Sequence, residues 1–296
     1  MTREQMKTTL ESYREQIESF LQTCLKDDSI PERLQSAMEY SLFAGGKRIR
    51  PTLCLVWAEL LSGSREHPLG FACSLECIHT YSLVHDDLPA MDDDDLRRGQ
   101  PSNHIKYGQA LAILAGDGLL TEAFSLMLSH DRHPERTLQA AAEVARAAGP
   151  RGMVGGQVLD ILMTGKGQGD LEMLKSMHSL KTGALLRASC LSGAMLAGAD
   201  HADLSLADQY GTAIGLAFQI ADDILDITGE EQAIGKPVGS DESRGKLTYP
   251  SLLGLDESKA LGFRMVEQAT AALEKYSGPQ SQFLADLARY IMERTT

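Results

Sequence analysis

The sequence predicts an all-α protein, folded as a single large helical bundle around a deep central cavity. Aromatic residues make up only 5% of the chain, while Ala, Leu, Met and Glu recur throughout. β-Sheet proteins use more aromatic and β-branched residues, and the recurring residues here favour helices. Alternation of apolar and polar residues with a period of two is nearly absent. No Ser/Pro-rich linker interrupts the 296 residues, so residues 1–296 are expected to form one domain.

The first predicted helix begins just after Pro31, which suits a first helical turn. Leu34, Met38 and Leu42 recur every four residues and form one helical face. The glycine pair at 45–46 is expected to end this helix. Similar patterns predict helices over residues 51–62, 71–87, 107–129, 135–149, 170–195, 203–228 and 258–276. Residues 229–247 form the longest polar, glycine-containing gap, and a loop of this size is usually functional.

Charge and cysteine content restrict the class of protein. The chain carries 28 Lys and Arg against 41 Asp and Glu, a net charge of −13, which argues against general binding of nucleic acid or anionic membranes. Five cysteines are too few and odd in number for a disulfide framework, so a reducing compartment, the cytoplasm, is expected. The first residues lack the apolar core of a signal peptide. No run of 18 apolar residues occurs, so no membrane span is predicted.

Two clusters of carboxylates are the strongest functional signal. Residues 85–99 read HDDLPAMDDDDLRRG, with six aspartates within ten residues. A run of like charges is usually only a solvated surface. A second cluster changes this interpretation, because Asp222 and Asp226 lie four residues apart, on one helical face, among apolar neighbours. Buried carboxylates need a counter-charge, and Mg²⁺ typically takes one or two carboxylates together with substrate phosphate oxygens. Two such clusters facing each other would suit a diphosphate bridged by several Mg²⁺ ions.

Short basic motifs accompany the acidic ones. GGKRIRP at 45–51 places three cations beside a helix end, and Arg97 and Arg98 follow the first acidic cluster. Lys181, Lys236 and Lys246 each stand beside glycine or hydroxyl residues. Arginine and lysine side chains bind phosphate oxygens, so cationic spots in an acidic chain indicate a specific anionic ligand.

Taken together, these motifs resemble the trans-polyprenyl diphosphate synthases, most closely the bacterial-type farnesyl diphosphate synthases. The matching segments are DDLPAMD at 86–92, DDILD at 222–226, GGKRIRP at 45–51, GQVLDI at 156–161, KTGALL at 181–186, FQIADD at 218–223 and GKPVGSD at 235–241. The resemblance runs from about residue 28 onward. It implies the isoprenoid synthase type of helical bundle, a homodimer, and isopentenyl and allylic diphosphates as substrates.

The resemblance also implies a role for each matched residue. Asp86 and Asp92 are expected to bind two Mg²⁺ ions on the allylic diphosphate, and Asp222 a third, supported by Asp223 and Asp226. Contacts to the allylic diphosphate are implied for Arg97, Lys181 and Lys236. The isopentenyl diphosphate site is implied for Lys47, Arg50, His79 and Arg98. Thr182 and Gln219 are expected to face the developing carbocation. Lys181, Thr182 and Gln219 are therefore the candidate catalytic residues.

The expected reaction is head-to-tail prenyl transfer. Loss of diphosphate leaves an allylic cation, which the double bond of isopentenyl diphosphate attacks before a proton is lost, most simply to the departing diphosphate. Three alternatives are a geranylgeranyl diphosphate synthase, a non-catalytic partner subunit and a di-iron helical bundle. A partner subunit should lack one motif, yet both aspartate motifs are intact. A di-iron bundle needs paired Glu-x-x-His motifs, and only Glu76 and His79 show that spacing.

Product length is expected to depend on the helix before the first acidic cluster. At ~1.5 Å per residue, Tyr81 and Ser82 lie about 6–7.5 Å deeper than Asp86. The small Ser82 leaves room for one extension, and the bulky Tyr81 can close the floor of the pocket. Pro89 is expected to distort the helix where it sits. In the resembling family an aromatic residue at this depth, with such an insert, goes with the fifteen-carbon product. His85 is interpreted as a structural histidine.

Overall fold

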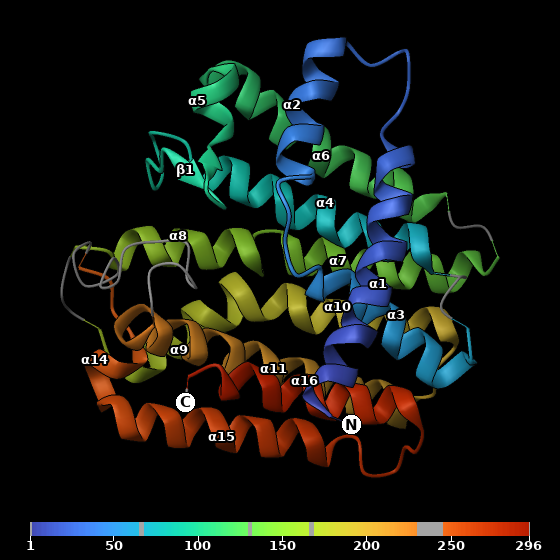
Figure 1. The fold of residues 1–296 in the computed structure, drawn as a ribbon, viewed down its shortest axis with the longest axis vertical. Helices are drawn as coiled ribbons and strands as arrows, with labels where there is room; N and C mark the ends of the chain where they lie inside the picture. The colour runs from blue at the N-terminus through green and yellow to red at the C-terminus, as the bar shows by residue number, and fades with distance from the viewer. Residues whose placement is uncertain (1, 65–67, 130–131, 166–168, 230–244, 296) are drawn as a thin grey trace.

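The computed structural model describes residues 2–64, 68–129, 132–165, 169–229 and 245–295 and is built almost entirely of helices, which run side by side in successive layers (Figure 1). The long helices are α1 (Arg3–Cys24), α2 (Glu32–Leu42), α3 (Ile49–Ser62), α4 (Leu69–Asp86), α6 (Gln109–Leu128), α7 (Pro134–Ala148), α8 (Met153–Met163), α10 (Ala184–Ala197), α11 (His201–Thr228), α15 (Leu255–Ala271) and α16 (Pro279–Glu293). The short ones are α5 (Asn103–Tyr107), α9 (Leu171–His178), the π-helical turn η1 (Ser179–Gly183) and α14 (Tyr249–Leu253).

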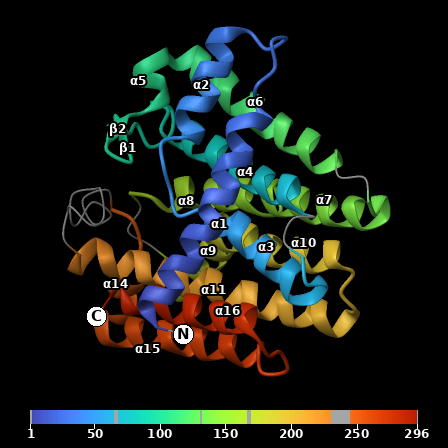
Figure 2. The ribbon, with the colours of Figure 1, turned by 45° about the vertical axis from the view of Figure 1, so that its right-hand side comes forward.

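Helix pairs that are distant in sequence make the core. Helix α4 packs on α6, α10 on α3 and α11, and α11 on α15. Figure 2 shows α1 crossing the layers, so that it ties α3, α4 and α16 together. Trp57 is fully buried on α3, with its ring edge-on to those of Tyr210 and Tyr276. The all-helical bundle predicted from composition and spacing is confirmed.

The structure refines several predicted helix boundaries. The first helix ends at Leu42, before the glycine pair expected to stop it. The segment 107–129 is divided at Gly108, whose φ of +87° breaks the helix between α5 and α6. The segment 170–195 contains the π-turn, which periodicity did not reveal. Helices α1, α8 and α16 were not predicted, although α1 opens with a capping box between Thr2 and Gln5.

The segment after α4 folds as a compact turn rather than as a bent helix. Helix α4 ends at Asp86, so the expected distortion of a helix at Pro89 is wrong: the helix has already ended. The Asp92 backbone N–H donates to the carbonyl of Asp86 at 2.9 Å, which folds the turn back on the helix end. Two short antiparallel strands, β1 (Leu96–Arg97) and β2 (Gln100–Pro101), then close the segment.

All five cysteines lie in described residues and are free thiols, as expected. Among the described helices, only α6 is long and apolar enough, by length and composition, to cross a membrane: its apolar window has a mean hydropathy of 1.6 and is 33% buried. A search for uninterrupted apolar residues missed it, because Asp117 and Glu122 interrupt the run. Helices inside soluble bundles pass the same test, so the absence of a span stays a prediction.

Candidate active site

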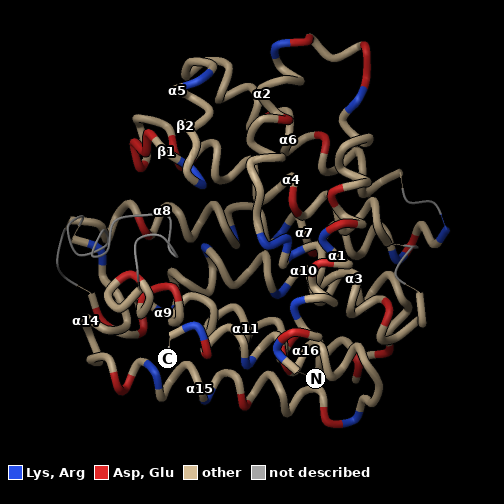
Figure 3. The backbone as a smooth tube through the Cα atoms, in the orientation of Figure 1, with Lys and Arg blue, Asp and Glu red and all other residues tan. Residues whose placement is uncertain are grey.

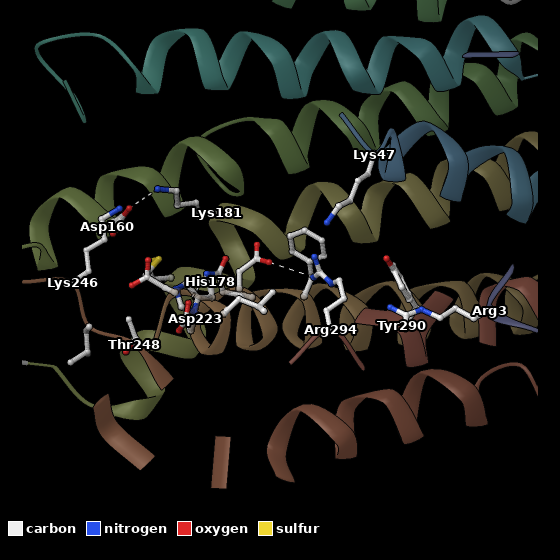
Figure 4. Close-up of a pocket in the computed structure, with 17 residues that line it drawn as sticks. Arg3, Lys47, Asp160, His178, Lys181, Asp223, Lys246, Thr248, Tyr290 and Arg294 are labelled. Atoms are coloured by element: carbon white, nitrogen blue, oxygen red, sulfur yellow. Dashed lines mark hydrogen bonds and ion pairs between the residues drawn. The ribbon is translucent and has the colours of Figure 1, made fainter. Parts of the chain in front are cut away.

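A cavity of ≈ 720 Å³ opens between α8, η1, α11 and α16, and charged side chains point into it from several sides (Figure 4). Asp222 and Asp226 line it from α11, and Lys181 lines it from η1. Lys47 and Arg294 also line it. The cavity thus gathers opposite charges that lie far apart in the sequence, as the predicted bundle with a central cavity requires.

The first acidic cluster lies at the end of α4. Burial raises the pKa of Asp86 to about 6, and neighbouring Asp92 adds to the effect, while Lys181 opposes it. Arg97 forms an ion pair with the buried Asp87 and a second with Asp94 at 3.3 Å. Figure 3 shows these acidic residues gathered beside β1, with others around α9 and α11. Arg97 therefore fixes the shape of the acidic turn in this structure, besides any contact with a substrate.

All three aspartates of the second cluster line the cavity, and one of them also ties α11 to a neighbouring helix. Asp222 and Asp226 lie one turn apart on the face of α11 that lines the cavity. Asp223 is buried, with one oxygen accepting from Gln219 Nε2 at 2.8 Å and the other from the Tyr249 backbone N–H at 2.9 Å. Asp223 thereby anchors the start of α14 to α11, a structural role that the motif alone did not indicate.

Two cations flank Asp222. The Arg294 guanidinium lies 3.5 Å from its carboxylate and over the ring of Phe218, 5.5 Å from the centroid. Burial raises the pKa of Asp222, and Arg294 and Lys47 oppose that rise. Burial lowers the pKa of Lys47, because it disfavours the charged form of this side chain as it does that of Asp222. Arg294 follows α16 and belongs to no motif, so sequence reasoning missed it.

A second cationic group lies around the start of α3. Burial lowers the pKa of Arg50 to about 10, and its Nε has no hydrogen-bond partner. Burial and then the charges of Arg50 and Arg98 hold the pKa of His79 well below its usual value, so this ring is neutral at pH 7. The Arg98 guanidinium packs against Gly46, where an added Cβ would lie 2.9 Å from its nitrogens. Arg48, between these residues in sequence, points inward and pairs with Glu76 at 2.8 Å.

The π-turn η1 presents Lys181 to the cavity, and its Thr182 contacts Gln219, which also lines the cavity. Lys181 Nζ lies 2.5 Å from the Asp160 carboxylate on α8, and Asp86 and Asp92 also act on its charge. Thr182 donates to Gln219 Oε1 at 3.1 Å. π-Turns occur frequently at functional sites, because the extra residue re-aims a side chain without ending the helix.

Two glycines, one on α8 and one on α11, allow η1 to pack closely between these helices. A Cβ on Gly156 of α8 would lie 2.5 Å from Lys181 Cα and 2.8 Å from the Leu180 carbonyl carbon. A Cβ on Gly215 of α11 would lie 2.8 Å from Gly183 Cα. Real Cβ atoms essentially never approach this closely, so the turn fits only against bare backbone. Gly156 stands in the GQVLDI motif, which sequence analysis recorded without assigning this role.

The remaining predicted residues are placed as follows. Tyr81 is 7% exposed on α4, and the Ser82 hydroxyl donates to the His79 carbonyl at 2.9 Å. Lys236 lies outside the described residues. His178 and Tyr249 were not predicted; their rings pack together 5.4 Å apart, and each has a buried polar atom without a partner. His178 lines the cavity, and burial lowers its pKa to about 3.

The protein side chains alone do not build a metal cage. In the described part of the chain, no group of three or more His, Cys, Asp or Glu residues could hold a metal ion. The carboxylates that face the cavity are hard oxygen donors, and a cation that uses them must complete its shell with other ligands. This fits an ion that arrives with a phosphate-bearing ligand.

Comparison with known proteins agrees with this geometry. The family described as "Polyprenyl synthetase" matches residues 31–278. The chain belongs to the polyprenyl synthetase family. It is 49% identical over 254 residues to a farnesyl diphosphate synthase of Geobacillus stearothermophilus, covering 84% of this chain and 85% of that protein. It is 46% identical over 266 residues to a geranylgeranyl diphosphate synthase of Cyanophora paradoxa, covering 89% and 88%.

A solved geranylgeranyl pyrophosphate synthetase of Pyrococcus horikoshii superposes with a TM-score of 0.91 at 29% identity, covering 98% of this chain and 99% of that one. The chain is therefore a trans-prenyl synthase of the all-α isoprenoid synthase fold, as the motifs indicated. Its relatives include enzymes named for both fifteen- and twenty-carbon products.

The fit of the π-turn gives a first prediction. Gly156→Ala should push η1 away from α8 and lower kcat by roughly 100-fold, because a shift of about 1 Å in a catalytic group can cost that much. Steady-state kinetics on folded protein, checked by circular dichroism, would measure it. Gly70→Ala is the matched control, since an added methyl there meets only the tip of the Phe20 ring at 3.3 Å. Equal activity in the two variants would contradict the role given to Gly156.

Proposed function

We propose that the protein is a Mg²⁺-dependent farnesyl diphosphate synthase, which condenses isopentenyl diphosphate with dimethylallyl and then geranyl diphosphate and releases diphosphate at each step. The observation that carries the proposal is the cavity itself. Carboxylates of α11 and cations from η1, the α2–α3 loop and the residue after α16 all point into it. Lys181 connects this cavity to the first acidic cluster, because Asp86 and Asp92 act on its charge.

Mg²⁺ fits the carboxylates of the two acidic clusters, of which the second lines the cavity. Asp86, Asp92, Asp222 and Asp226 would hold it, with three ions expected once diphosphate is bound. Burial raises the pKa of Asp86 and of Asp222 although cations lie near both, so a bound divalent cation would further stabilise their charged forms. When bound, the ions would neutralise the leaving diphosphate.

The residues of η1 are suited to the ionisation step. Lys181 supplies a cation beside the leaving diphosphate, and its pair with Asp160 fixes its position. The Thr182 proton is directed to Gln219, so the lone pairs of the hydroxyl oxygen remain available to the allylic cation that forms. Gln219 is held by Asp223, which keeps these dipoles oriented before the reaction.

Isopentenyl diphosphate is proposed to bind beside Lys47, Arg50, His79 and Arg98. The Arg50 Nε without a partner and the neutral His79 are both available as hydrogen-bond donors to phosphate oxygens. Held there, the double bond of this substrate would attack the allylic cation, forming the new C–C bond. A proton then leaves the adjoining carbon, most simply to the departing diphosphate. No side-chain base is required for this step.

The fifteen-carbon product is proposed from the position of Tyr81. Its side chain is buried on α4, one and a half turns before Asp86, and Asp86 acts on its hydroxyl, whose pKa burial raises to about 12. A tail that starts at the metals and runs along α4 would meet this ring after limited extension. The alternative is a twenty-carbon product, since relatives of both kinds match the chain.

Removal of a metal ligand should stop the reaction without unfolding the bundle. Asp86→Asn and Asp222→Asn are each expected to lower kcat by at least ~10³-fold, the cost of losing a main electrostatic stabiliser. Asp95→Asn is the control, because this exposed aspartate belongs to the same acidic run but has no proposed role. Turnover of isopentenyl and geranyl diphosphates would be measured, with folding checked by circular dichroism. Near-wild-type turnover in Asp86→Asn or Asp222→Asn would refute the metal assignment.

Product chromatography tests chain length. The wild type should give mainly the fifteen-carbon alcohol after dephosphorylation, and Tyr81→Ala should shift the products to twenty carbons or more. Tyr81→Phe keeps the ring and should keep the wild-type distribution. A twenty-carbon product from the wild type would overturn the farnesyl assignment, and an unchanged distribution in Tyr81→Ala would remove Tyr81 as the floor.

We also propose that two copies of the chain pair through α6. Two thirds of its apolar window lies outside the core, and Leu114 and Leu128 are 54% and 61% exposed. Exposed apolar surface of this kind is typical of protein interfaces. Sedimentation equilibrium should give a dimer for the wild type and monomers for Leu114→Glu. Phe263→Glu on α15 is a control that should stay dimeric, and a monomeric wild type would contradict the pairing.

A further inference from the structure

Beyond Tyr81 itself, the structure connects the proposed floor of the product pocket to a second helix through His85. The His85 ring stands edge-on to that of Tyr81, with 5.7 Å between centroids and 82° between planes. Its Nε2 lies 3.0 Å from the backbone carbonyl oxygen of Ile113 on α6. A carbonyl oxygen only accepts, so Nε2 must carry a proton in this contact. His85 therefore bridges the Tyr81 ring and the backbone of α6.

This bridge depends on the absence of a side chain at position 116. A Cβ on Gly116 would fall closer to His85 Nε2 and Cδ2 than real contacts allow, and 2.9 Å from Cε1. The Nε2 end of the imidazole thus occupies the space beside Gly116 that a side chain would fill. The hydrogen bond to Ile113 fixes the ring there, so it cannot swing aside without losing that bond. By contrast, a Cβ on Gly118 would meet the flexible end of Met38, with Sδ at 3.0 Å.

We propose that His85, seated on Gly116, is a positioning residue for product length: it fixes the rotamer of Tyr81 and thereby the depth of the pocket. This inference rests on the proposed function, in which Tyr81 forms the floor. Rings in edge-to-face contact attract each other beyond simple burial. Without the imidazole, the Tyr81 ring loses its support on the α6 side, and the growing chain can displace it.

The product ratio is the measurement that separates this role from a merely structural one. His85→Ala should raise the ratio of twenty- to fifteen-carbon products by roughly threefold or more, the size expected for loss of one edge-to-face ring contact. His85→Phe restores a ring and should bring the ratio back toward the wild-type value. Because His85 adjoins Asp86, rates can fall in any of these variants. The ratio is therefore compared at equal total conversion.

Double variants test the connection through α6. Gly116→Ala should change the product ratio, whereas Gly118→Ala should not. In the His85→Ala background Gly116→Ala should have no further effect, because the new methyl occupies space that the imidazole has left. In the Tyr81→Ala background His85→Ala should likewise add nothing, since residues in one contact chain act non-additively.

The outcomes distinguish this inference from the proposed function. A longer product from Tyr81→Ala together with an unchanged ratio in His85→Ala overturns the role of His85 and leaves the floor in place. An unchanged ratio in Tyr81→Ala removes the floor, and the role of His85 falls with it. Full additivity of His85→Ala and Tyr81→Ala also overturns the proposal.

Discussion

Negative charge held at the edge of an apolar helical bundle is the constraint on which the rest of this structure depends. Asp86 ends α4, and Asp222 lies near the end of α11; burial raises the pKa of both. Such carboxylates are costly unless cations approach them. Lys181 and Arg97 act on the charge of Asp86, and Arg294 pairs with Asp222, each from a different element. Together these cations compensate part of the negative charge of the two acidic clusters. The remaining negative charge is available to a ligand that binds between them.

The packing of the long helices makes this arrangement possible. Helix α11 spans His201–Thr228, so one long helix presents Gln219, Asp222 and Asp226 to the cavity. Close approach between helices depends on bare backbone at a few positions. Gly193 of α10 is one of them, since an added Cβ would lie 2.9 Å from the Cys54 carbonyl carbon on α3. Close packing of the helices thus holds the charged side chains of the cavity in fixed positions, despite the repulsion between like charges.

Local patterns in the sequence predicted the fold class, which the structure confirms, and singled out most of the charged residues now found in or near the cavity. Four-residue spacing predicted α2, and the aspartate clusters stood out by composition. The contacts that orient these charged side chains join segments that lie far apart in the sequence. The Arg294–Asp222 pair joins α11 to the residue after α16, and the Asp223–Tyr249 bond joins α11 to α14. Nothing in either local segment signals its partner, so only the folded chain reveals them.

The proposed floor of the product pocket shows the same limit. The depth of Tyr81 follows from helix rise alone, and sequence reasoning could place it. The support behind the Tyr81 ring involves α6 and a glycine whose importance is the absence of a side chain. An absent side chain leaves no periodicity in a sequence, so the contact between His85 and Gly116 is visible only in the folded chain.

The π-turn η1, between α9 and α10, determines how the faces of these two helices are aligned. A turn of this kind contains about one residue more than an α-helical turn, so the faces of α9 and α10 are offset by about 100° of rotation. Loss of one residue from 179–183 would restore a continuous α-helix and would rotate the buried Leu174 and Met177 of α9 by about 100° relative to α10. Lys181 or its successor would then point elsewhere than toward Asp160. One residue of this turn therefore sets both the packing of α9 and the direction of Lys181, so neither can change without the other.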